Sequence, residues 1–280
     1  MILVRSPSVR HVDSRADGLQ NATLVIVSIA GLLAFFLPFL ISALPNAVDH
    51  VSSRTVEASL LLALIVGGSL IVAVGELVRG PGSGNLARSV ALLGALVAID
   101  ATLRLVPSFL GASPIFALIV LVGYVFGPRF GFVMGSLTLL LSAAITAGVG
   151  PWLPFQMLCA AWVGVVAGWL PESTSARAEL ATAAALGAFT GFAYGALMNL
   201  YSWPFAAPGV TTDVGLYWSP GLSLMESIQR YTTFYVATSL VHDATRALAT
   251  ALLIVIAGAP VIRLLRRFHA RAAWSTSRSR

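Results

Sequence analysis

The sequence predicts an all-α polytopic membrane protein, and three observations support this fold class. Hydrophobic residues make up 58% of the 280 positions and charged residues only 10%, against roughly 25% charged in soluble domains. Several apolar runs reach the roughly 20 residues that a helix needs to cross a bilayer of about 30 Å. Runs such as LLLALIVGGSLIVAV are apolar on every face, whereas strands of a membrane barrel would alternate apolar and polar residues.

Eight membrane helices are expected from these runs, the fourth being the shortest. They lie near residues 23–43, 57–78, 88–106, 113–127, 129–147, 155–170, 178–201 and 231–262.

The N-terminus does not look like a cleaved targeting signal. Residues 1–22 are polar and carry arginine, and the first apolar run is already full length, so we expect no cleaved segment. The single cysteine, Cys159, lies inside an apolar run. It excludes an intramolecular disulfide and a cysteine-based metal site, and we expect it to be a small buried hydrophobe.

The arginines predict the orientation. All 17 basic residues are arginine, and the net charge is +6. With the N-terminus inside, 13 arginines fall on the cytoplasmic side and three (Arg54, Arg104 and Arg230) outside, which is a strong positive-inside bias. Both termini are therefore predicted to be cytoplasmic, and the loop GVGPWLPFQM (148–157) faces outward. In a membrane protein this charge reflects orientation rather than binding to nucleic acid.

A Gly/Pro/Ser-rich break, RGPGSGN (79–85), suggests how the chain is divided. We predict a cytoplasmic segment over 1–22, two separate helices within 23–85, a six-helix domain over 86–268 and a basic tail over 269–280. The arginines of that tail would lie near anionic lipid headgroups of the inner leaflet.

Polar residues within the runs gather toward the predicted outer surface. Asp100 lies about 18 Å above the cytoplasmic Arg88 at 1.5 Å per residue, with Arg104 one turn further out. Counted back from Arg263, Arg246 and Asp243 lie about 26 and 30 Å from the cytoplasmic end. Ionisable groups at such depths are costly and therefore informative.

These residues form the candidate binding site, although each also has a structural interpretation. The i,i+4 and i,i+3 spacings let each acid meet its arginine on one helix face, as an ion pair or as a ligand contact. An amide side chain offers both donors and acceptors, and a tryptophan can line a site or belong to the interfacial belt. The candidate ligand-binding residues are Asp100, Arg104, Trp152, Gln156, Asn199, Trp203, Asp243 and Arg246. A lone His242 is expected to be a packing residue, the alternative being a proton relay.

Several chemistries are not supported by the sequence. A P-loop needs lysine, which the chain lacks, and HExxH, GxSxG and metal-spaced His/Cys sets are missing as well. We therefore expect no enzyme activity, resident cofactor or metal. No internal repeat of the kind seen in many secondary transporters is evident.

Small residues follow one face of the third predicted helix. Ala87, Ala91 and Ala95 recur at four-residue spacing, with Gly94 and Ala98 on the next row. Such rows let helix backbones approach closely in lipid, within the bundle or against a partner.

Residues 86–268 resemble the substrate-binding S-components of energy-coupling factor (ECF) vitamin transporters. The similarity rests on VFGPRFGFVMG (125–135), GVGPWLPFQMLCAAWVG (148–164) and MNLYSWPF (198–205). It implies a six-helix domain with an outward cavity under extracellular loops, which docks on a transmembrane coupling subunit driven by two ATPases. It also implies that Ala91 and Ala95, extended by Ala87, contact that coupling subunit. The two N-terminal helices depart from the minimal S-component, and the ligand does not follow from the resemblance.

The leading hypothesis is thus a vitamin-binding subunit in a bacterial cytoplasmic membrane, with cobalamin or a precursor as first guess. In that interpretation Pro151 and Pro154 stiffen the loop that carries Trp152 and Gln156, and residues 203–230 form a second lid. The main rival is a self-contained proton-coupled permease that uses Asp100, Asp243 and His242. A third class, a membrane scaffold, predicts no small-molecule binding.

Overall fold

The computed structural model describes residues 14–41, 53–78, 83–106, 110–173, 175–203, 215–219 and 221–274. Within these ranges the chain forms helices joined by turns, and no strand is described. The helices are α1 (Ser14–Ile41), α2 (Ser53–Val78), α3 (Ser83–Leu103), α4 (Ile115–Phe126), α5 (Pro128–Ile145), α6 (Leu153–Gly168), α7 (Ala176–Ser202), α8 (Leu224–Thr238) and α9 (Leu240–Trp274).

The all-α membrane fold is confirmed. Each of the eight predicted runs is helical, and α1, α2, α5, α7 and α9 are long and apolar enough to cross a membrane. The last run differs from the prediction because its first residues belong to α8, and α9 begins only at Leu240. Helix α1 also starts at Ser14, inside the segment predicted to precede the membrane, and α9 continues to Trp274, inside the predicted tail. The rest of that tail, and residues 79–82 of the predicted domain boundary, lie outside the described residues.

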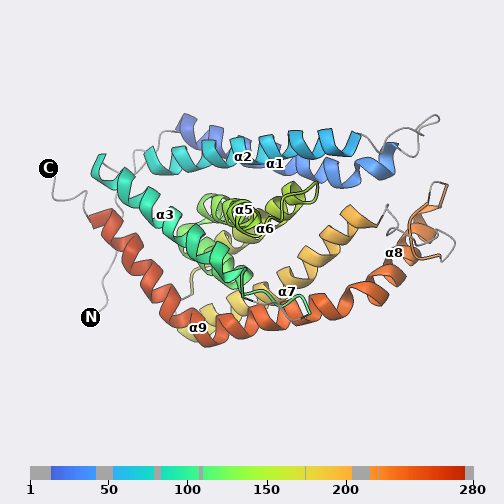
Figure 1. Ribbon diagram of the computed structural model, residues 1–280. Helices are drawn as coiled ribbons and strands as arrows, with labels where there is room; N and C mark the ends of the chain where they lie inside the picture. The colour runs from blue at the N-terminus through green and yellow to red at the C-terminus, as the bar shows by residue number, and fades with distance from the viewer. Residues whose placement is uncertain are drawn as a thin grey trace.

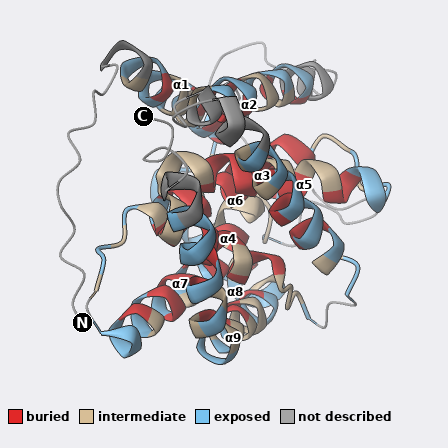
Figure 2. Cartoon of the chain, turned by 90° about the vertical axis from the view of Figure 1, so that its left-hand side faces the viewer, coloured by how far each residue is buried: buried red, intermediate tan, exposed pale blue. Residues whose placement is uncertain are grey.

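The helices surround a central pair, α5 and α6, which pack closely on each other and on α4 (Figure 1). Helices α1 and α2 cover one side of this centre, α3 lies along another, and α7 packs on α9 below it (Figure 1). Burial follows the same arrangement, since the buried residues concentrate on α4, α5 and α6 (Figure 2).

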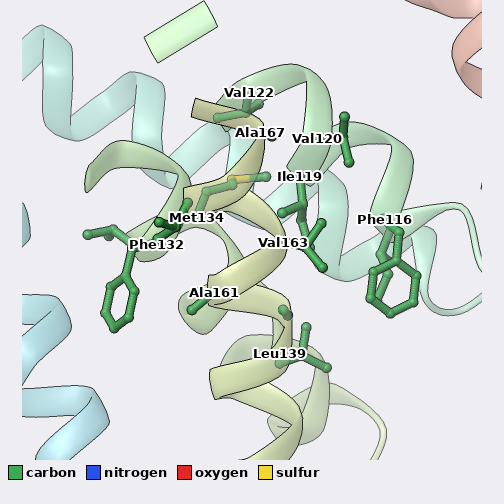
Figure 3. Close-up of a cluster of buried hydrophobic side chains, with 14 of the residues drawn as sticks. Phe116, Ile119, Val120, Val122, Phe132, Met134, Leu139, Ala161, Val163 and Ala167 are labelled. Carbon is green, nitrogen blue, oxygen red and sulfur yellow. The ribbon is translucent and has the colours of Figure 1, made fainter. Parts of the chain in front are cut away.

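Glycines set the close approach of the central helices. A Cβ atom on Gly164 would lie 2.1 Å from the carbonyl oxygen of Gly131, and one on Gly135 would lie 2.3 Å from that of Ala160. Neither contact leaves room for a side chain. Around this contact Phe132, Met134, Ala161 and other apolar residues of α4, α5 and α6 form the core (Figure 3), which also contains Cys159, buried and free as expected.

Helices α1 and α2 are joined to the centre by polar contacts as well as by packing. The hydroxyls of Ser69 and Ser136 lie 2.8 Å apart, both buried. The Trp162 indole donates to the Ser28 hydroxyl at 2.9 Å. Arg129 pairs with Asp17 at 2.6 Å. The two N-terminal helices are therefore packed against the rest of the bundle along α5 and α6.

One end of the bundle carries a charged cluster. Glu179 of α7 is buried and paired with Arg266 of α9 at 2.5 Å, and the Tyr124 hydroxyl donates to it at 3.1 Å. Helix α1 begins and α9 ends at this same end (Figure 1). The beginning of α1 and the end of α9 thus lie on one side of the bundle (Figure 1).

Candidate functional site

A cavity of about 300 Å³ lies at the opposite end of the α7–α9 pair, where α8 meets α9. Its wall combines aromatic, amide, hydroxyl and charged groups. The lining residues are Tyr194, Gly195, Met198, Asn199, Thr238, Ser239, His242, Asp243 and Arg246.

A break in the chain at Ser239 shapes one wall of this cavity. Ser239 has φ −125° and ψ −25°, which departs from helical values, so α8 and α9 meet at an irregular turn. Helical hydrogen bonds continue across it, since the Ser239 amide donates to the Tyr235 carbonyl and the Asp243 amide donates to the Ser239 carbonyl, both at 2.9 Å. The Ser239 hydroxyl donates to Oδ1 of Asn199 at 3.1 Å, which ties the break to α7. Thr238 and Asp243 therefore reach the same cavity from two helices.

Helix α8 has a well-defined beginning, which fixes the segment that leads to this break. The Ser223 hydroxyl caps the amide of Glu226, and the Glu226 carboxylate accepts from the Ser223 amide at 2.9 Å. This reciprocal pair is a capping box. The hydrogen bonds from Ser223 also hold the pKa of Glu226 below its ordinary value.

A glycine row on α7 makes room for the other wall. Gly187, Gly191 and Gly195 recur every four residues and face α9. A Cβ atom on Gly191 would lie 2.6 Å from the Cα of Ala247, and one on Gly195 would lie 1.8 Å from Oδ2 of Asp243. Only glycine at position 195 therefore leaves space for the aspartate between the two helices.

Asp243 and Arg246 form an ion pair at the base of the cavity. The side chain of Asp243 is 2% exposed and that of Arg246 is 15% exposed. Arg246 also donates to the Gly191 carbonyl at 3.3 Å and lies 5.2 Å from the centre of the Tyr194 ring. The predicted i,i+3 pair is present, and it is anchored to α7 by two further contacts.

Two buried polar atoms in the cavity wall have no hydrogen-bond partner among the described residues. They are Oδ2 of Asp243 and Nδ2 of Asn199. The ring of Tyr194 and the side chain of Met198 supply apolar surface beside them. Both atoms are enclosed by protein, and the Tyr235 side chain is already hydrogen-bonded to the Asp243 carboxylate, so the other polar atoms of the wall are the ones that the cavity presents to a ligand.

The structure brings three of the eight candidate residues, Asn199, Asp243 and Arg246, to this cavity. Both tryptophans contact the chain elsewhere. Trp203 is buried, donates to the Leu216 carbonyl at 2.9 Å and packs on Tyr231. Trp152 is 43% exposed and donates to the Gly148 carbonyl within its own loop at 3.3 Å.

The expected contact between Asp100 and Arg104 is not formed. Helix α3 ends at Leu103, so Arg104 has left the helical path that would align it with Asp100, and its guanidinium donates to Ser142 at 3.0 Å. Asp100 is fully buried, and its nearest polar partner among the described residues is the Thr138 side chain of α5, without well-formed hydrogen-bond geometry. Gln156, at the start of α6, likewise keeps a buried Oε1 without a partner there.

His242 differs from its prediction. It is exposed and lines the cavity instead of packing in the core. The sequence reasoning also missed Tyr194, Thr238 and Ser239. The four-residue spacing of the glycines on α7 is the sequence signal for this close contact with α9.

On α3, the row of small residues lies on the exposed surface of the helix bundle. Ala91 and Ala95 are exposed, and a Cβ atom on Gly94 would meet nothing within 4 Å. The side chain of Ala87 is not among those described. Among the described residues, no group of three or more His, Cys, Asp or Glu is placed to hold a metal ion.

A family model described as "ECF transporter, substrate-specific component" matches residues 88–258, well over half of the chain. The protein belongs to this family. Membership makes it a transporter subunit rather than a catalytic enzyme in its own right, and it implies association with an ECF coupling subunit and ATPases. Neither the curated proteins nor the solved structures include a match. The matched range begins in α3 and ends in α9, so α1 and α2 lie outside it.

Proposed function

We propose that this S-component captures a vitamin or related micronutrient in the cavity between α7 and the α8–α9 junction. The observation that carries the proposal is the cavity itself, whose wall sets the Asp243–Arg246 ion pair and the Asn199 amide beside the Tyr194 ring and the Met198 side chain. A concave site that combines a few polar groups with apolar and aromatic side chains is typical of small-molecule binding.

The cavity faces outward in this proposal. The 13 to 3 distribution of arginines supports that direction, and the charged cluster of Glu179 and Arg266 then lies at the cytoplasmic end. Bound ligand would close the outer segments, and the domain would topple against its coupling subunit, while two ATPases supply the energy for release inward. The surface that docks on the coupling subunit is the exposed row of small residues on α3, with Ala91 and Ala95 and their continuation at Ala87. The host membrane is the bacterial cytoplasmic membrane.

The size of the cavity bears on the ligand. A volume of about 300 Å³ is at the lower end of small-molecule sites, which span roughly 300–1,000 Å³. The cavity is open on one side, so a larger ligand such as cobalamin or a cobalamin precursor, the first guess from the resemblance, could extend beyond it.

Native mass spectrometry of the detergent-purified protein, expressed without partners, tests the proposal. We expect a stoichiometric small molecule on the wild type, its loss in Asn199→Ala, and its retention in Gln229→Ala, which changes an exposed amide on α8. Protein that stays empty against a vitamin panel, yet catalyses uncoupler-sensitive uptake in liposomes, would instead support the proton-coupled permease. Protein that neither binds nor transports would support the scaffold.

A further inference from the structure

Helix α1 reaches the cavity end of the bundle, although it lies outside the range matched by the family model. Its residue Phe39 packs on two tryptophans, with 5.8 Å between its ring centre and that of Trp203 and 5.3 Å to that of Trp218. The contact with Trp218 is edge-on, a geometry that aromatic pairs favour. Trp203 caps α7 one turn beyond Asn199 of the cavity wall, so α1 contacts the chain close to the candidate site.

Three consecutive residues between α7 and α8 are each held by a different group. The carbonyl of Leu216 accepts from the Trp203 indole at 2.9 Å. The carbonyl of Tyr217 accepts from Arg230 of α8 at 3.4 Å. The ring of Trp218 packs on α1. Helix α1 therefore supplies one of the contacts that fix the chain where it enters α8.

Aromatic contacts connect these rings with the cavity wall. Trp203 packs edge-on against Tyr231 of α8, with 5.1 Å between ring centres. Tyr231 stacks on Tyr235 one turn further along α8, and its hydroxyl donates to the Ala196 carbonyl of α7 at 2.5 Å. The Tyr235 side chain is hydrogen-bonded to the Asp243 carboxylate. The ring that Trp203 contacts thus holds α8 against α7 beside the cavity.

Helix α8 has little buried surface of its own. Among its 15 residues, all of them described, Phe234 alone is buried. A helix with so few buried side chains is held in place by individual contacts, such as those of its two tyrosines. Thr238 and Ser239, where α8 meets α9, line the cavity, so the position of α8 determines the position of that wall.

We propose that α1 belongs to the ligand site and that Phe39 is a positioning residue, which acts on ligand affinity through Trp203 and α8. The inference rests on the proposed function, because it assigns a residue outside the family range to the proposed site. With Phe39 in place, α8 and its junction with α9 keep one arrangement before the ligand arrives. A preformed wall lowers the entropy that is lost on binding.

Hydrogen–deuterium exchange of the full-length protein in detergent tests this positioning without a ligand. Phe39→Ala removes both ring contacts of α1, and we expect the amides of α8 to exchange about fivefold faster or more. Phe39→Tyr keeps the ring and should exchange as the wild type. Leu33→Ala, which truncates an exposed side chain of the same helix, should also exchange as the wild type. Unchanged exchange of α8 in Phe39→Ala would overturn the proposal.

A second variant of α1 separates positioning from general stability. Phe35 is buried, and its ring centre lies 4.8 Å from that of Phe155 in the core. We expect Phe35→Leu to lower the transition temperature at least as much as Phe39→Ala, while α8 exchanges at the wild-type rate. Equal acceleration of α8 in both variants would make Phe39 a structural residue only and overturn its positioning role.

The small molecule that co-purifies with the wild type provides the second measurement. We expect Phe39→Ala to bind it at least about tenfold more weakly, and Phe39→Tyr and Leu33→Ala to bind it as tightly as the wild type. Faster exchange of α8 with unchanged affinity would refute the role of α1 in the site and leave the binding subunit intact. A wild type that carries no molecule and shows uncoupler-sensitive transport would refute the proposed function itself.

Discussion

Two helix contacts in this protein use the same small-residue device with opposite results. Between α5 and α6, the missing side chains of Gly131, Gly135 and Gly164 let backbone meet backbone, and the contact is closed. Between α7 and α9, the carboxylate of Asp243 occupies the space that a side chain at Gly195 would fill. The first contact holds the core together, whereas the second admits a charged group and borders a cavity. A row of small residues thus indicates that two helices approach closely. The residue that faces the row decides whether the helices pack backbone against backbone or enclose a charged group beside a cavity.

The largest loss of stability is expected when a side chain is added at the close contact between α5 and α6. In Gly164→Ala the new Cβ would lie 2.1 Å from a backbone oxygen, and backbone cannot move aside cheaply. We expect a loss of at least about 3 kcal/mol of stability, the upper range for overpacking, measured by thermal unfolding in detergent. Gly67→Ala is the control, because nothing lies within 4 Å of its Cβ position. Equal transition temperatures for the two variants would refute the distinction.

At the contact between α7 and α9, we expect a smaller loss of stability and a loss of ligand affinity. In Gly195→Ala the new Cβ would displace the Asp243 carboxylate, which is a side chain and can move. We expect ligand affinity to fall about ten- to hundredfold, equivalent to about 1.4–2.8 kcal/mol, while the transition temperature changes less than in Gly164→Ala. Titration of the co-purified ligand measures the affinity. If Gly195→Ala lost stability to the same extent as Gly164→Ala and kept its ligand, the two contacts would be equivalent.

The smallest effect is expected where hydroxyls join α2 to the core. Removing the Ser69–Ser136 hydrogen bond should cost about 0.6 kcal/mol, the average for such bonds between membrane helices. A double-mutant cycle with Ser69→Ala and Ser136→Ala isolates this coupling energy. A coupling energy of zero would mean that α2 is held on α5 by packing alone.

The sequence predicts the helices well because length and hydropathy alone decide them. Helix α8 was missed because LMESIQRYTTFYVAT (224–238) mixes polar and apolar residues, and a single break at Ser239 separates it from α9. The Asp243–Arg246 pair was predictable because i,i+3 spacing within one helix fixes the geometry. The same reasoning was wrong for Asp100 and Arg104, since it assumed that α3 continues beyond Leu103.

Contacts between distant segments were beyond what the sequence could show. Trp203 is held by the Leu216 carbonyl and also packs against Phe39 of α1, 5.8 Å between ring centres. No local pattern connects position 203 with α1, because that contact exists only after the two added helices have packed on the bundle.

Helices α7 and α9 are fastened to each other at two points, by Asp243 and Arg246 at the cavity and by Glu179 and Arg266 at the other end. Along α7, Gly191 and Glu179 are 12 residues apart, about 18 Å at 1.5 Å per residue. Over that length a tilt of about 10° shifts the far end by about 3 Å. This shift is comparable to the N–O distance of an ion pair. A tilt of α7 against α9 at the cavity would therefore break or form the Glu179–Arg266 ion pair at the other end, and the state of that ion pair would report on the cavity.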